Sequence, residues 1–328
     1  MAPLRNITIV GASGNVGLPI TLALAASPAK FALTALTRLT SSPSPRLPPS
    51  VRILRADYND KAALVEAFRG QDAVVCTIGS TSNTLQDTLI DAAAEAGVRR
   101  FIPSHFAFDH LAEKDGLPLS EIIPVGSLKE APVKKIEDLR AAGSKMEWTA
   151  VVTGPWVDFF VSTPDFPFWD VQSQTFVKFD DGTSAFDCSS LAQVGRAVVA
   201  VLSAENFEKT KDQYVYIRSG RLTQNRVLEI LEKESGQKWN VVPNQASELR
   251  AHGAALWDKL MKEEGKTPDQ LTDSPEYGMA IGMLVGSIIL GGWVVFEEKA
   301  KRWMQELGLK EEDPEIVVSK AIREAMAA

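Results

Sequence analysis

The chain has 328 residues, of which 45% are hydrophobic and 23% are charged, as is typical of a soluble globular protein. The 35 Lys and Arg against 42 Asp and Glu give a net charge of −7, which argues against nucleic-acid binding through overall charge. Cys76 and Cys188 are too few for a disulfide framework or a four-cysteine zinc site. We therefore expect a protein without a metal. We also expect it to be cytoplasmic, because its first residues enter a strand without a secretory signal.

The first half of the chain alternates short apolar strands with helical segments. The predicted strands are Asn6–Val10, Phe31–Thr37, Val51–Leu54, Ala73–Thr77, Arg100–Pro103 and Trp148–Thr153. The predicted helices are Leu18–Ala26, Lys61–Phe68, Leu85–Ala96 and Val133–Ala142. This alternation is typical of an α/β Rossmann fold, a doubly wound parallel sheet.

The second half is less regular and indicates a smaller C-terminal α+β lobe. We divide the chain into a nucleotide-binding Rossmann domain, 1–156, and a mainly substrate-binding lobe, 157–328, with some later elements returning to the sheet. The lobe's predicted elements are a hairpin over Phe176–Phe186 around Asp181-Gly182, a strand at Tyr214–Ile217, and helices at Leu191–Leu202, Val227–Lys233 and Ala246–Lys262.

One segment of the lobe has the length of a membrane span. Gly278–Phe296 is 19 residues without a charge, and Gly278, Gly282 and Gly286 have small-xxx-small spacing. Its five glycines lower its helix propensity, and amphipathic helical sequence follows it. We therefore favour a buried segment that lines an apolar pocket, with a membrane span as the weaker alternative.

Three glycines between the first strand and the first helix have the spacing of a dinucleotide phosphate loop. The first permits a tight turn, the second lets backbone N–H groups approach a pyrophosphate, and the third allows close helix–strand packing. The helix N-terminus adds positive partial charge. The predicted cofactor contacts in this loop are Gly11, Ser13, Gly14, Asn15, Val16 and Gly17.

The charge after the second strand selects between the two nicotinamide dinucleotides. Residues 1–56 contain six basic residues and no Asp or Glu. An NAD site needs a carboxylate about 20 residues after the loop, but Thr37-Arg38 stands there. Arg38 can bind a 2′-phosphate bidentately, with hydroxyl donors from Thr37, Ser41 or Ser42. The sequence therefore predicts NADPH (NADP+) rather than NADH.

Two further segments are predicted to contact this cofactor. Asp57 follows the third strand and either faces the adenine or serves only as a loop cap. Ile78, Gly79 and Ser80 follow the fourth strand and are expected to run along the ribose and phosphates.

Four motifs together resemble the NmrA-like, isoflavone-reductase-like branch of the atypical short-chain dehydrogenases, especially its fungal members. They are GASGNVG at 11–17, Thr37-Arg38, GVRRFIPS at 97–104 and TGPW at 153–156. The resemblance covers residues 5–240 and implies a Rossmann domain, NADPH, and reduction of aromatic or conjugated small molecules. It places Gly154, Pro155 and Trp156 at the cofactor. It also implies an alternative, because NmrA-like regulators bind a dinucleotide and catalyse nothing.

The proton donor of ordinary short-chain dehydrogenases, a Tyr-x-x-x-Lys pair, is missing from the expected region. The tyrosines are Tyr58, Tyr214, Tyr216 and Tyr277, and none lies between the fifth strand and the end of the helix that follows it. In reductases of the resembled branch, a lysine on the helix after the fifth strand contacts the nicotinamide ribose and acts as acid or base.

Here Pro132 occupies the expected place of that lysine, with Lys134 half a turn beyond it and Lys129 before the predicted helix. Burial can lower the pKa of an amine toward neutrality, which suits proton transfer. We expect Lys134 first, and Lys129 second, to be catalytic; the alternative is that both are solvated helix charges.

A histidine is a third candidate for the proton donor. Residues 103–107 read Pro-Ser-His-Phe-Ala, where members of the resembled family often have Pro-Ser-Glu-Phe-Gly. His105 would then lie at the carboxyl edge of the sheet, where ligands bind in such folds, and histidine titrates near neutral pH. The alternative is a structural histidine.

Aromatic residues crowd the stretch after the sixth strand, which suits a flat, apolar substrate, although core packing would explain some of them. They are Trp156, Phe159, Phe160, Phe166, Phe168 and Trp169. The predicted substrate contacts are Phe106, Trp156, Phe159 and Phe160.

The sequence thus favours an NADPH-dependent reductase of an aromatic or polyketide-like small molecule, with a homodimer as the candidate assembly. Hydride passes from nicotinamide C4 to a conjugated C=C, a C=O or a benzylic carbon, with Lys134, Lys129 or His105 supplying the proton. The alternatives are an NADP-sensing regulator and a redox-neutral isomerase or dehydratase.

Overall fold

The computed structural model describes residues 4–41, 45–79, 83–122, 127–162, 168–170, 173–263, 265–271 and 274–327. The largest sheet in this part of the chain has seven strands in the order β12-β8-β5-β4-β1-β2-β3, and all neighbours are parallel. The strands are β1 (Asn6–Val10), β2 (Ala32–Arg38), β3 (Arg52–Ala56), β4 (Ala73–Cys76), β5 (Arg100–Ile102), β8 (Glu147–Val152) and β12 (Gln213–Tyr216). This order is that of a Rossmann sheet with one further strand, which confirms the predicted fold class.

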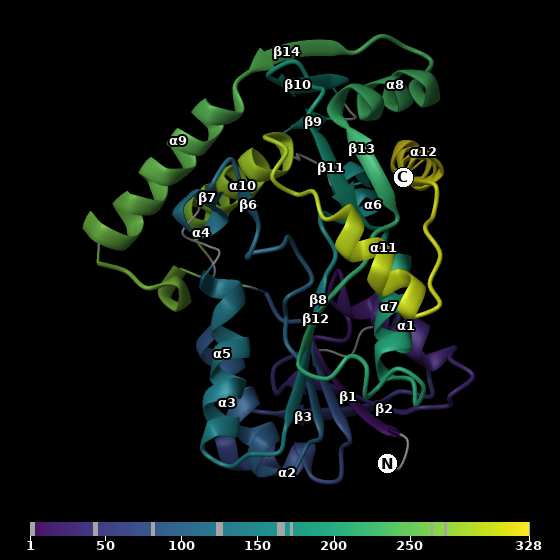
Figure 1. Ribbon diagram of the computed structural model, residues 1–328, viewed down its shortest axis with the longest axis vertical. Coiled ribbons are helices and arrows are strands. Elements are labelled where there is room, and N and C mark those ends of the chain that lie inside the picture. Colours follow the sequence, from purple (N-terminus) through teal and green to yellow (C-terminus); the bar gives the residue numbers. More distant parts are fainter. Residues whose placement is uncertain are drawn as a thin grey trace.

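Helices cover both faces of this sheet (Figure 1). On one face lie α2 (Lys61–Phe68), α3 (Asn83–Glu95) and α5 (Ser127–Ala141). On the other lie α1 (Gly17–Ala25), α7 (Leu191–Leu202) and α11 (Glu297–Glu306). Successive strand residues therefore alternate between two cores: Ile7 and Ile9 belong to one, and Val10 to the other. Burial on both faces explains the continuous apolar runs in the sequence.

Two elements from the later part of the chain return to the Rossmann layer. β12 pairs with β8, with Gln213 opposite Thr149. α7 packs against α1 so closely that a Cβ at Gly195 would stand 2.8 Å from the Pro19 carbonyl oxygen. The division at residue 156 stays a prediction, but the expected return of later elements to the sheet is observed.

The remaining elements form a second layer beyond the carboxyl ends of the strands (Figure 1). One small sheet contains β9 (Trp169–Asp170), β10 (Thr175–Phe179) and β14 (Asn240–Asn244), another β11 (Ala185–Cys188) and β13 (Gly220–Thr223), and a third β6 (Glu113–Lys114) and β7 (Leu117–Pro118). The helices are α4 (Leu119–Ile122), α6 (Val157–Ser162), α8 (Gln224–Ser235), α9 (Ala246–Asp258), α10 (Pro275–Leu290) and α12 (Pro314–Ala327), with a π-helical turn (Lys259–Glu263) and a 3₁₀ turn (Pro268–Leu271).

The predicted hairpin over Phe176–Phe186 is wrong. A turn forms there, since the Gly182 N–H donates to the Phe179 carbonyl oxygen, but the strands on either side join different sheets. β10 pairs with β14 in parallel, and β11 pairs with β13 in antiparallel orientation. Both partners come from far later in the chain, so the local pattern of a turn between apolar runs could not identify them.

The uncharged segment Gly278–Phe296 forms most of α10 and the turn after it. α10 has 16 residues, and its helix ends before the turn at Gly291-Gly292. Among the described residues, no helix has the length and hydropathy needed to cross a bilayer. Glycines 291 and 292 interrupt the apolar run, which is why its length in the sequence exceeds the length of the helix.

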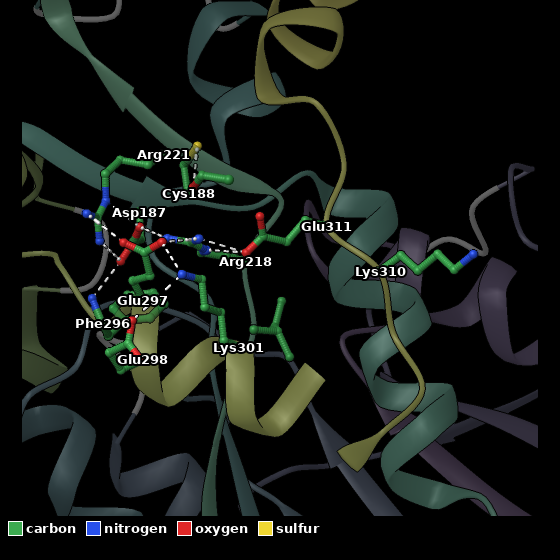
Figure 2. A network of polar contacts seen from close by, with 12 residues as sticks. Asp187, Cys188, Arg218, Arg221, Phe296, Glu297, Glu298, Lys301, Lys310 and Glu311 are labelled. Carbon is green, nitrogen blue, oxygen red and sulfur yellow. Dashed lines mark hydrogen bonds and ion pairs between the residues drawn. The ribbon is translucent and has the colours of Figure 1, made fainter. Parts of the chain in front are cut away.

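A network of charges centred on a buried carboxylate joins the second layer to α11 (Figure 2). The carboxylate of Asp187 on β11, fully buried, lies 2.7 Å from Arg218 and 2.9 Å from Arg221. It also accepts a hydrogen bond of 2.6 Å from the backbone N–H of Phe296. Arg218 in turn contacts Glu297 at the start of α11. The network therefore fixes the segment between α10 and α11 to the small sheet of β11 and β13.

Candidate active site

A cavity of about 310 Å³ lies at the carboxyl ends of β1, β2 and β4. The strand order reverses at β1, and such switch points are where ligands bind in doubly wound sheets. Its lining contains the predicted Gly11, Ser13, Gly14, Thr37, Arg38, Ser41, Ile78 and Gly79, together with Ala12, Leu36, Leu47, Tyr58, Thr77 and Leu85. We call it the nucleotide cavity.

Close backbone packing explains two of the three loop glycines. Gly11 has φ +83°, a conformation that favours glycine, and a Cβ there would stand 2.8 Å from the Thr77 hydroxyl oxygen. A Cβ at Gly17 would stand 2.1 Å from the Gly11 carbonyl oxygen. Any side chain at either position would therefore displace the loop that opens α1.

The nucleotide cavity is suited to an anion. No Asp or Glu is among its described lining residues, and the first turn of α1 contains no acidic residue. The N-cap residue Val16 has no polar side chain, so no capping side chain occupies the N–H groups at the start of α1. Arg38 lines the cavity, and its side chain is exposed to solvent.

Arg46 is a second cation near this cavity, beside the phosphate loop, and the sequence analysis did not assign it a role. Its guanidinium donates to the Ser13 carbonyl oxygen at 3.4 Å, which places it beside the phosphate loop. It was visible only as one of the six basic residues before residue 57. Arg46 and Ser13 are far apart in the sequence, so no local pattern predicts the contact between them.

Several predicted cofactor contacts lie apart from this lining. The carboxylate of Asp57 accepts hydrogen bonds from the backbone and side chain of Asn59, as its loop-cap alternative requires. Asn15 is exposed, and Val16 is buried at the start of α1. Tyr58, which was not predicted, lines the cavity and donates to the Leu36 carbonyl oxygen at 2.8 Å. Ser42, Ser80 and Phe166 lie outside the described residues.

A second cavity, of about 190 Å³, collects most of the predicted substrate contacts. We call it the first chamber; its described lining is Phe106, Ala107, Phe108, Lys129, Gly154, Pro155, Trp156, Phe160, Val285 and Ile289. Phe159 is not in this lining, and its ring packs against that of Trp156 with centroids 6.0 Å apart. The chamber thus lies between the carboxyl end of the Rossmann sheet and α10, which forms its far wall.

Lys129 is the sole cationic side chain among the described residues of the first chamber. It lies in the first turn of α5, and its Nζ donates to the Ser104 carbonyl oxygen at 2.9 Å. Burial lowers the pKa of its amine to about 8. An amine with this pKa can both hold and release a proton near neutral pH.

Ser104 connects the first chamber with the nucleotide cavity. Its hydroxyl donates to the carbonyl oxygen of Ile78, which lines the nucleotide cavity, at 2.5 Å. Its N–H donates to the side-chain oxygen of Gln86 at 2.7 Å. The hydrogen bonds of Ser104 therefore join the ends of β4 and β5 to the start of α5, where Lys129 lies.

The structure places the two candidate lysines in different surroundings. Lys134, the first choice, is exposed on α5 and belongs to neither lining, whereas Lys129 lies in the first chamber. The helix was expected to begin at Val133, after Pro132, but it begins at Ser127 and contains the proline. Lys129 therefore shares the buried helix face of Val133 and Ile136, while Lys134 points away from it.

His105 lies in the core rather than in either cavity. Its Nε2 lies 3.0 Å from His110 Nδ1, and the other nitrogen of His110 lies 3.5 Å from the Tyr214 hydroxyl. Burial lowers the pKa of His105 well below its ordinary value, which favours a neutral ring. This geometry favours the structural alternative for His105, and its role as a proton donor stays a prediction.

Metal ligands do not gather in the described part of the chain. No group of three or more His, Cys, Asp or Glu residues there could hold a metal ion. Cys76 and Cys188 are both buried as free thiols.

A Rossmann sheet with a glycine loop at its switch point and a basic cavity defines a dinucleotide-binding protein. The model of the NmrA-like family matches residues 4–249, and the chain belongs to that family. This confirms the resemblance drawn from the four motifs.

Known relatives agree with this assignment. Oxidoreductase aprR of Aspergillus flavus is 35% identical over 238 residues, which cover 72% of this chain and 76% of the relative. The isoflavone reductase homolog IRL of Zea mays is 28% identical over 260 residues, which cover 74% of this chain and 78% of that relative. Among solved structures, Citrobacter sp. triphenylmethane reductase complexed with NADP(H) has a TM-score of 0.68 at 19% identity, covering 96% and 99% of the two chains. That similarity establishes the shared fold.

Proposed function

We propose that the protein is an NADPH-dependent reductase of an apolar, aromatic or conjugated small molecule, with Lys129 as the proton donor. The observation that carries the proposal is the position of Lys129: its amine, with a pKa of about 8, lies in an aromatic chamber. Through Ser104 this amine is tied to the wall of the nucleotide cavity.

The residues of the nucleotide cavity fit NADPH. Arg38, with Arg46 beside the phosphate loop, suits a 2′-phosphate, and no described lining residue carries the carboxylate that an NAD site would use. Gly11 and Gly17 allow the tight turn and the close packing that place the phosphate loop at the start of α1, where a pyrophosphate would bind. The solved relative from Citrobacter sp., a complex with NADP(H), and the oxidoreductase name of the Aspergillus flavus relative support this cofactor and reaction class.

When bound, the cofactor supplies a hydride from its nicotinamide ring. The chain's own residues then have three tasks. The rings of Phe106, Trp156 and Phe160 hold a flat substrate and exclude water from the chamber. The Lys129 ammonium donates the proton that the reduced product needs, and the Ser104 carbonyl holds that ammonium in place.

The test is a reductase assay with purified protein, NADPH and a panel of quinones, enones and isoflavones. Loss of absorbance at the nicotinamide band, with NADPH preferred to NADH, is the expected result. Tight NADP+ binding without turnover on any substrate, and no effect of Lys129→Met on binding, would overturn the proposal and favour an NADP-sensing regulator. Conversion of a substrate without NADPH consumption would favour the isomerase or dehydratase.

A further inference from the structure

A third cavity, of about 650 Å³, adjoins the first chamber at α10. We call it the second chamber. β10, α9 and α10 contribute most of its walls, with Phe168, Phe179, Leu249 and Met283 among the apolar side chains. Asn244 and His252 are the polar side chains of its described lining, and none of those residues is an Asp, Glu, Lys or Arg. The chamber therefore suits an uncharged, apolar occupant.

The two chambers share a wall. Phe160 of α6 and Val285 and Ile289 of α10 line both of them. A cavity of about 150 Å³ accommodates a benzene molecule, so the first chamber, at about 190 Å³, holds little more than one ring. A ring placed beside Lys129 and bearing a substituent toward these three side chains would direct that substituent into the second chamber.

The glycines of α10 explain why the second chamber is open. A Cβ built at Gly278 or Gly282 meets no atom within 4 Å, and both residues line the chamber. Gly286 differs, because a Cβ there would stand 2.1 Å from the Phe168 ring and would not fit. A methyl group at Gly282 would therefore lie in open space at the wall of the chamber, and a longer side chain would begin to fill the chamber.

We propose that the second chamber binds an apolar chain attached to the ring that occupies the first chamber. The substrate class is then a single aromatic or quinonoid ring with a long alkyl or prenyl substituent. The inference rests on the proposed function in taking the first chamber as the place of the reacting ring. Its physical basis is the set of residues that the two chambers share. A chain attached to the ring buries additional apolar area in the second chamber. Because chain and ring are one molecule, translational freedom is lost once and not twice.

The test measures binding, so that it does not depend on turnover. Phenol, 4-butylphenol and 4-octylphenol are titrated calorimetrically into the protein and into Gly282→Ala, Gly282→Leu and Glu276→Leu. In the unmodified protein, affinity is expected to rise with chain length by up to about fourfold for each methylene that is buried. Gly282→Leu should remove most of this gain and leave the affinity for phenol unchanged, with Gly282→Ala intermediate.

Glu276→Leu is the matched control, because it adds the same side chain to an exposed position of α10 outside both described linings. It should keep the full chain-length dependence. Replacing a helical glycine by Ala or Leu raises helix propensity, so both Gly282 variants should fold. A gain with chain length that survives Gly282→Leu, or no gain in the unmodified protein, would overturn the inference. Absence of reductase activity with an intact chain-length effect would instead refute the proposed function alone.

Discussion

The Lys129 amine donates a hydrogen bond of 2.9 Å to the main-chain carbonyl oxygen of Ser104. This bond lies where the first chamber meets the nucleotide cavity. A carbonyl oxygen can accept a hydrogen bond from the amine in either protonation state, so it holds Nζ in place without neutralising a charge. No carboxylate accompanies Lys129 in the described lining of the chamber. Burial therefore dominates its pKa, which falls to about 8.

Replacing Lys129 by Met should abolish most of the reductase activity. Removing a general acid costs a factor of about 10² to 10⁴, so kcat/KM should fall at least a hundredfold. Lys134→Met is the matched control, because it makes the same change on the exposed face of the same helix. Its kcat/KM should stay within about twofold of the unmodified protein. Steady-state kinetics of both variants give the comparison, and equal losses in the two would refute the assignment.

The same amine predicts the pH dependence of the reaction. Lys129 must be protonated to donate, and its pKa in the folded protein is lowered to about 8. Activity should therefore be fully present below that pH and should fall tenfold per unit above it. The measurement is kcat/KM for reduction between pH 6 and pH 10. The residual rate of Lys129→Met should lack this decline, and a rate that rises through pH 8 would contradict the role of Lys129 as an acid.

The position of Lys129 shows where prediction from sequence failed and why. Proline is disfavoured inside a helix, and the predicted helix starts at Val133, directly after Pro132. The helix begins five residues before Pro132 and loses one backbone hydrogen bond there. A signal was available, because Lys129, Val133 and Ile136 have the i, i+4, i+7 spacing of one helix face. That face is buried, and it carries the lysine into the chamber.

Other parts of the molecule depended on local signals that could be interpreted correctly. The strand, glycine loop and helix at the N-terminus were predicted to within a residue, because tight turns and buried strands use restricted residue types. The position of Arg38 follows from counting along that motif. By contrast, Arg46 and the second chamber depend on contacts between distant segments, which a single sequence does not encode in any local pattern.

Arg38→Ala should weaken NADPH binding and leave NADH binding nearly unchanged. A hydrogen bond to a charged group contributes about 1.5–3 kcal/mol, which corresponds to a Kd for NADPH at least tenfold higher. Calorimetric titration with both coenzymes measures the two effects separately. Arg55→Ala is the control, because Arg55 is also exposed, at the next strand β3, but does not line the nucleotide cavity. Equal weakening of both coenzymes by Arg38→Ala, or no weakening at all, would exclude the 2′-phosphate contact.

Asp187→Ala should be among the most destabilising substitutions in the chain. The carboxylate is fully buried, and its loss leaves Arg218 without its innermost partner and the Phe296 N–H without an acceptor (Figure 2). Removing one partner of a buried ion pair costs about 3–5 kcal/mol. Urea unfolding followed by circular dichroism should show a loss of that size in the free energy of unfolding.

The control for Asp187 is an ion pair of the same type at the surface. Glu66 and Arg69 lie 2.6 Å apart with side chains 68% and 64% exposed, and such pairs contribute about 0–1 kcal/mol. Glu66→Gln should therefore change stability little. If Asp187→Ala proved no more destabilising than Glu66→Gln, the network would not be what fixes the segment between α10 and α11. Because that segment follows α10, which lines both chambers, Asp187→Ala should also weaken binding of 4-octylphenol more than binding of phenol.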